Sequence, residues 1–235
     1  MIFNTVMGEG AAKLPEFEYT GQFQLIDDGK EGMTQNWRIK FLTSGVLTFA
    51  KDPGSIDVFL VGGGGGGARY HGVAGGGGYT KTFPSVVLFK ETPYEIVIGA
   101  GGEKGNSSGG VPSAGGDTTF DTTMIANGGK GAEIGNSAYF GGDGGSGGGG
   151  ALAGLGGVDG ADGTGGDNPG KGQGSTTRAF EESDGELYST GGNGPRNTTG
   201  ADGQPNTGDG GCGGDGSVVS YSGGSGIAII RNHRG

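Results

Sequence analysis

The chain has 235 residues, a formal net charge of −10 and 64 glycines, which is far above the roughly 7% glycine of ordinary proteins. Its largest basic group, Arg231, His233 and Arg234, is interpreted as a solvated chain end, so nucleic acid is not expected as a partner. The single cysteine, Cys212, excludes an internal disulfide, and the sequence has neither a stretch of about 18 apolar residues nor a signal-peptide pattern, so membrane insertion is not expected.

Residues 1–16 are interpreted as an attachment segment, and strand patterns follow. Between Phe17 and Leu25, apolar and polar residues alternate as in a half-buried strand. Further strand patterns occupy residues 37–41, 46–49, 57–61, 79–83, 86–89, 94–98, 118–120, 218–221 and 226–231. Helix patterns are nearly absent, apart from a short turn of helix expected near 177–182. The sequence therefore predicts an all-β fold, an antiparallel β-sandwich built of short strands.

Glycine-rich stretches lie between the predicted strands, at residues 62–67, 75–78, 99–116 and 128–216. We expect them to project from one end of the sandwich. The chain would then consist of a sandwich, formed by residues 17–127 together with 217–235 and carrying the shorter glycine-rich loops, and an inserted glycine-rich unit of residues 128–216.

Glycine recurs at every third position within the inserted unit. The row comprises Gly142, Gly145, Gly148, Gly154, Gly157, Gly160, Gly163 and Gly166, with Ala151 as the one exception. Three residues per turn is the period of polyproline II geometry, so we predict a bundle of polyglycine II helices whose side-chain-free faces meet. A disordered linker has no reason to keep this period, and a collagen helix needs far more proline than the chain contains.

No residue pattern indicates a catalytic, metal or cofactor site. The apolar run before Gly62 resembles the strand of a dinucleotide-binding motif, but no helix follows that could hold the pyrophosphate. The two histidines, His71 and His233, lack partners at zinc-ligand spacing, and no catalytic triad can be assigned. Segments 156–164 and 210–218 match the calcium-binding nonapeptide only in part, and their aspartates are interpreted as turn residues. We therefore expect a protein that is not an enzyme and has no metal or cofactor.

Large side chains interrupt the glycine stretches at a few places. If the stretches are rigid rods, the interruptions are turns at the rod tips, where aromatic, arginine and asparagine side chains suit recognition of a glycan or a protein. The candidate ligand-binding residues are Arg69, Tyr70, His71, Tyr139, Phe140, Asn193, Arg196 and Asn197. For Tyr139 and Phe140, packing on the sandwich remains an open alternative.

Four segments carry a resemblance to a known group: VFLVGGGGGG (58–67), GGGGYTKTF (75–83), YEIVIGAGG (94–102) and GGSGIAIIR (223–231). With LIDDG and NWRIKFLTSGVLTF before them, they resemble the glycine-rich virion proteins of bacteriophages and prophages of gut bacteria. The layout is more distantly similar to the glycine-rich region of anaplastic-lymphoma-kinase-type receptors, where a tumour-necrosis-factor-like sandwich carries polyglycine helices, and to the polyglycine adhesins of some phage tail fibres. The resemblance implies a jelly-roll sandwich with a glycine-helix bundle, a binding role and frequent trimerisation.

We therefore expect a non-enzymatic virion surface protein, made in the host cytoplasm, that forms a tail-fibre tip or binds the host receptor. The expected partners are two further copies in a homotrimer, other virion proteins through residues 1–16, and a glycan or protein of the host surface. Two alternatives remain open: a structural decoration or head-fibre protein of the same particle, and a bacterial cell-surface matrix protein.

Overall fold

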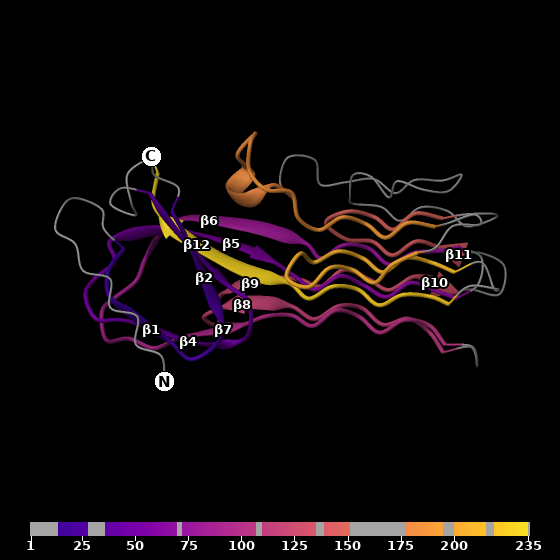
Figure 1. Ribbon diagram of the computed structural model, residues 1–235, viewed down its shortest axis with the longest axis horizontal. Helices are drawn as coiled ribbons and strands as arrows, with labels where there is room; N and C mark the ends of the chain where they lie inside the picture. The colour runs from indigo at the N-terminus through magenta and orange to yellow at the C-terminus, as the bar shows by residue number, and fades with distance from the viewer. Residues whose placement is uncertain are drawn as a thin grey trace.

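The computed structural model describes residues 14–27, 36–69, 72–106, 110–134, 139–150, 177–194, 200–214 and 219–234. The molecule is elongated, with two β-sheets at one end and glycine-rich segments that run side by side away from them (Figure 1). We call these segments the glycine array, and the end of the array that lies away from the sheets the distal end.

Two five-stranded sheets form the β-sandwich. The first has the order β1 (Phe17–Tyr19), β4 (Gly45–Phe49), β7 (Tyr94–Val97), β8 (Thr118–Phe120) and β9 (Met124–Ala126). The second has the order β2 (Phe23–Asp27), β3 (Trp37–Phe41), β12 (Ile227–Asn232), β5 (Ser55–Val61) and β6 (Thr80–Val87). Neighbouring strands are antiparallel in both sheets, which confirms the predicted all-β class.

Apolar side chains of both sheets meet in one core. In β3 the alternation of the sequence places Trp37, Ile39 and Phe41 in this core, while Arg38 and Lys40 lie on the opposite face. The same core includes Leu47, Phe49, Ile96 and Phe120 of the first sheet and Val58, Leu60, Ala228 and Ile230 of the second. Burial of each large side chain of this kind contributes about 1.5–3 kcal/mol, so the sandwich supplies most of the hydrophobic stabilisation.

The last strand occupies the middle of the second sheet. β12 lies between β3 and β5, and Ile230 stands opposite Ile39 on one side and Val58 on the other. Residues 227–231 are buried on both faces, which accounts for the nearly continuous apolar sequence of this strand. The sheet is therefore complete only when the chain has returned from the glycine array.

Some local features differ from the sequence prediction. Residues 80–87 form the single strand β6, which continues through Ser85 although that residue has a φ of 55°. The three-residue strand β9 was not predicted, because it is too short to show an alternation. The helical turn expected near 177–182 is the 3-10 turn η2 (Ala179–Glu181), and residues 219–221 run in the glycine array without strand pairing. Across the described part of the chain, none of the helices has the length and hydrophobicity needed to cross a bilayer.

The segment of residues 62–68 lies at the centre of the glycine array, and its N–H groups follow a three-residue repeat. The N–H groups of Gly62, Gly65 and Ala68 donate to carbonyl groups of one neighbouring segment, at Tyr79, Gly76 and Val73, respectively. Those of Gly63 and Gly66 donate to a second segment, at Gly116 and Ser113. Those of Gly64 and Gly67 donate to a third, at Gly224 and Tyr221. Consecutive N–H groups therefore donate to different neighbouring segments, and every third one donates to the same segment. This is the pattern expected of a chain with three residues per turn.

The carbonyl groups of this segment accept hydrogen bonds from three other stretches of chain. Those of Gly63 and Gly66 accept from Gly129 and Ala132, those of Gly64 and Gly67 from Gly102 and Gly105, and those of Gly65 and Ala68 from Gly211 and Gly214. The central segment thus has hydrogen-bonded neighbours on all sides, and its backbone groups are paired without a β-ladder. The array includes loops before residue 128 as well as segments after it.

Glycine is required at these positions because the backbones approach too closely for a side chain. A Cβ added to Gly65 would lie 2.0 Å from the carbonyl oxygen of Lys130, and one added to Gly67 would lie 2.1 Å from that of Cys212. From the predicted row, Gly142 and Gly148 show the same crowding, with distances of 1.9 Å and 2.2 Å to the nearest carbonyl oxygens, and Gly145 is buried. Gly154, Gly157, Gly160, Gly163 and Gly166 lie outside the described residues.

Substitution of a central glycine should therefore cost far more than substitution of an exposed one. We expect Gly65→Ala to lower the free energy of unfolding by about 3 kcal/mol or more, because the methyl group must push two backbones apart. Gly54→Ala is the control: it has open space around it and a φ of 75°, so only about 1 kcal/mol of backbone strain is expected. Urea unfolding followed by the fluorescence of Trp37 measures both, and equal losses would contradict the close approach.

Candidate functional site

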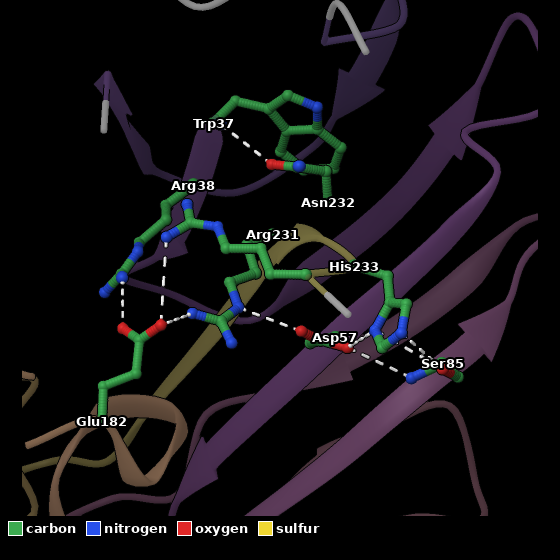
Figure 2. A network of polar contacts seen from close by, with 9 residues as sticks. Trp37, Arg38, Asp57, Ser85, Glu182, Arg231, Asn232 and His233 are labelled. Carbon is green, nitrogen blue, oxygen red and sulfur yellow. Dashed lines mark hydrogen bonds and ion pairs between the residues drawn. The ribbon is translucent and has the colours of Figure 1, made fainter. Parts of the chain in front are cut away.

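Asp57 is the centre of a polar network on the second sheet. It lies at an irregularity in the pairing of β5 with β6, and its side chain is 4% exposed. The carboxylate accepts hydrogen bonds from Arg231 Nε at 3.0 Å and from the Ser85 amide at 3.1 Å, and it lies 2.6 Å from His233 Nδ1 (Figure 2). Burial alone would raise the pKa of Asp57, but the bonds from His233, Ser85 and Arg231 outweigh it and lower that pKa.

Ser85, His233 and Asp57 together have the composition of a catalytic triad, which the sequence did not indicate. Their geometry does not suit nucleophilic catalysis. The Ser85 hydroxyl lies 3.1 Å from His233 Nε2 and 3.4 Å from Nδ1. An oxygen at nearly equal distances from both nitrogens faces the ring between them, whereas a general base must receive the proton along the outward axis of Nε2. The arrangement therefore holds the end of β12 in place.

A second carboxylate joins the network from residues 177–189, which we call the covering segment. Glu182 accepts a hydrogen bond from Arg38 at 2.8 Å and another from Arg231. Phe180 packs against the same arginines, with the Arg231 guanidinium 4.0 Å from the ring centroid. Burial would raise the pKa of Glu182, but its bonds to Arg231 and Arg38 lower it overall. Arg231, expected to be solvated, is instead 6% exposed because Asp57 and Glu182 pair with it.

Aromatic contacts complete the attachment of the covering segment. The rings of Phe180 and Tyr188 both pack against Phe59 of β5, with centroids 5.7 Å away. Lys40 of β3 pairs with Glu186 at 2.5 Å. The covering segment thus covers the outer face of the second sheet over β3, β12 and β5, where it pairs with Arg38, Lys40 and Arg231.

A pocket of about 360 Å³ opens beside this network. It is lined by Arg38, Glu182, Asp184, Gly185, Glu186 and Arg234. These walls are charged and lack the apolar surface on which small-molecule sites usually depend, so we assign no ligand to the pocket. Among the described residues, no group of three or more histidine, cysteine, aspartate or glutamate side chains could hold a metal ion.

The distal end of the glycine array presents a different surface. Ala68, Val73 and Ala132 form a small buried cluster there. Ser113, Ala132 and Tyr221 are hydrogen-bonded to Gly66 or Gly67, and each has an apolar residue two positions away in the chain: Val111, Ile134 and Val219, respectively. Phe140 pairs with Glu133 in the short ladder of β10 (Glu133–Ile134) and β11 (Tyr139–Phe140). These four apolar side chains are 71%, 38%, 53% and 38% exposed, in the order Val111, Ile134, Val219 and Phe140. Figure 1 shows β10 and β11 at this end.

The structure brings the described members of the predicted binding set to the same end. Arg69 is partly buried directly beyond Ala68, Phe140 is exposed, and the backbone of Tyr139 pairs with Ile134. Asn193 is exposed, and its carbonyl group accepts from Gly213. Tyr70, His71, Arg196 and Asn197 lie outside the described residues. The sequence did not single out Val111, Ile134 or Val219, because isolated aliphatic residues among glycines do not differ in pattern from buried ones.

Comparison with known families agrees with the glycine-rich character of the chain. The sequence profile of a family described as a glycine-rich domain matches residues 42–233. The matched range includes β4 to β12 and the described segments of the array. No match was found among curated proteins.

Removal of the Asp57 carboxylate should be severely destabilising. Asp57→Ala leaves the buried guanidinium of Arg231 without this partner, and we expect a loss of about 3–5 kcal/mol in the free energy of unfolding. Ser85→Ala is the control, since its exposed hydroxyl contacts only the face of His233, and a loss below about 1 kcal/mol is expected. Urea unfolding of both variants tests this ranking, and a larger loss for Ser85→Ala would overturn it.

The attachment of the covering segment should weaken in acid. The folded-state pKa of Glu182 lies below its unfolded value of 4.5, so its stabilising contribution is present above about pH 4.5 and is lost as the pH falls through the folded value. We expect Glu182→Gln to lower stability by about 1–2 kcal/mol at pH 7 and to lose less than the wild type on acidification. Unfolding midpoints measured at pH 7 and in acid decide this, and identical pH profiles of the two proteins would refute it.

Proposed function

The chain belongs to the glycine-rich domain family, and from that premise we propose that it is a non-enzymatic surface protein of a bacteriophage particle that attaches the particle to its host cell. The observation that carries the proposal is the concentration of exposed apolar side chains from separate loops at the distal end. Such side chains on a rigid support suit recognition of another surface.

The glycine array provides that support, and we propose that its segments are polyglycine II helices. The three-residue repeat of hydrogen bonds around residues 62–68 supports this, and so does the crowding at Gly65 and Gly142. A loop whose base is fixed by several hydrogen-bonded neighbours loses little conformational entropy on binding, which favours affinity.

The jelly-roll topology belongs to the same proposal. The chain passes repeatedly between the two sheets, since β1, β4 and β7 lie in the first sheet and β2, β3, β5 and β6 in the second. Alternation of this kind is typical of sandwiches with Greek-key connections. The segments that resemble phage and prophage virion proteins at 58–67, 75–83, 94–102 and 223–231 all fall inside the matched range.

The proposal places the host contact at the distal end, opposite the sandwich that holds the first and last described residues. Leu14 belongs to the core of the sandwich, and Arg234 lies 4.0 Å from Glu182. The partner at the distal end is a glycan or protein of the host surface. Other virion proteins would bind at the sandwich end, in keeping with the role proposed for residues 1–16.

Adsorption of the particle tests the distal contact. We expect Ile134→Ser with Phe140→Ser to reduce the adsorption rate by about tenfold or more, because apolar anchors carry much of the binding energy at interfaces. Val46→Ser with Val97→Ser is a matched control: these side chains are 37% and 38% exposed, against 38% for both distal residues, but lie on the sandwich. Particles must first be shown to incorporate both variants equally.

Unchanged adsorption at equal incorporation would contradict a receptor-binding role and favour a decoration or head-fibre protein. Absence of the chain from purified particles would contradict both and favour a cell-surface matrix protein.

A further inference from the structure

A second exposed apolar surface lies on the sandwich, away from the array. Val87 and Phe89 are each 62% exposed, on either side of Leu88, which is 3% exposed and belongs to the core. β6 starts beside the array, where the Gly62 amide donates to Tyr79, and ends at Val87. This surface therefore lies at the opposite end of the molecule from the distal loops (Figure 1).

The backbone that carries Phe89 is fixed on several sides. Its own amide donates to the Tyr94 hydroxyl at 2.7 Å, the Lys90 amide donates to Asp52 Oδ1 at 2.8 Å, and the Glu91 amide donates to the Phe49 carbonyl group at 2.7 Å. Three consecutive amides thus bond to three different parts of the sandwich. The phenyl ring is presented to solvent by a rigid turn, which is the form that aromatic anchors take at protein interfaces.

Exposed charged residues of both signs lie on the two turns beside this apolar pair. Lys51 and Asp52 on one turn and Lys90 and Glu91 on the other are exposed, and their charges cancel. An apolar centre within a polar rim is the usual anatomy of a protein contact. In a chain with a net charge of −10, a charge-balanced rim is a surface at which two copies can meet without local repulsion.

We infer that the surface formed by Val87 and Phe89 binds the same surface of a second copy of the chain. A two-fold contact requires a patch that is complementary to itself, and a rim with equal numbers of lysines and acidic residues meets that requirement, since a lysine of one copy can stand opposite an acid of the other. A membrane or a nucleic acid would instead require a rim of one predominant sign. The contact leaves both glycine arrays pointing away from it.

The inference differs from the homotrimer that the family resemblance implies, so the mass in solution separates them. The patch is small, and we expect weak association with a dissociation constant on the order of 0.1 mM. Sedimentation equilibrium from about 1 μM to about 0.5 mM should show a mass that rises from 23.0 kDa towards twice that value. Val87→Ser with Phe89→Ser should weaken the association by tenfold or more.

Two variants of the charged residues and one control at the distal end keep the test informative if that pair fails to fold. Lys51→Glu with Lys90→Glu makes the rim wholly acidic and should also weaken association, whereas Lys90→Glu with Glu91→Lys exchanges the charges, keeps the balance and should preserve it. Ile134→Ser with Phe140→Ser at the distal end should leave association unchanged. A monomer or trimer at every concentration, or a dimer that survives both the serine pair and the acidic rim, overturns the inference. Failure of the adsorption experiment does not affect it.

Discussion

Hydrogen bonds between backbones join residues 62–68 to the described segments around them, and at Gly62 to Gly67 the distances leave no room for a Cβ. Each such bond contributes about 0.5–1.5 kcal/mol net, while ordering a residue costs about 1–2 kcal/mol, with glycine at the upper end. The array therefore gains little stability by itself and depends on the apolar core of the sandwich. β5 leads directly into the array at Gly62, and the chain leaves it at Gly226 to form β12. Array and sandwich are for this reason parts of one folding unit.

The covering segment adds a second connection between the two parts. It interrupts the glycine-rich stretch of residues 128–216 and lies on the outer face of the second sheet, where Phe180 and Glu182 contact Arg38 and Arg231. Arg231 also pairs with Asp57, so a single guanidinium links β12, β5 and the covering segment (Figure 2). The carboxylates of Asp57 and Glu182 balance the positive charges of Arg38 and Arg231. This pairing explains why a face rich in arginine and lysine stabilises the fold.

Local patterns predicted the strands, because alternation in 37–41 and the apolar run of 57–61 depend only on neighbouring residues. The three-residue period also indicated backbone contacts without side chains. The partners of residues 62–68 could not be predicted, since they are set by the register of segments far apart in the chain. The same applies to Asp57 and Arg231, which are 174 positions apart and carry no spacing signal. Val87 and Phe89 fitted a strand pattern, and nothing in that pattern distinguishes an exposed face from a buried one.

The three-residue repeat of the central segment also limits how its length can change. With the polyglycine II geometry that we propose, one inserted residue would turn every later N–H group by about 120° and direct it at the wrong neighbour. An insertion of three residues would restore all directions and lengthen the segment by about 9.3 Å. Viable array lengths therefore form a discrete series, and all neighbouring segments must change in step.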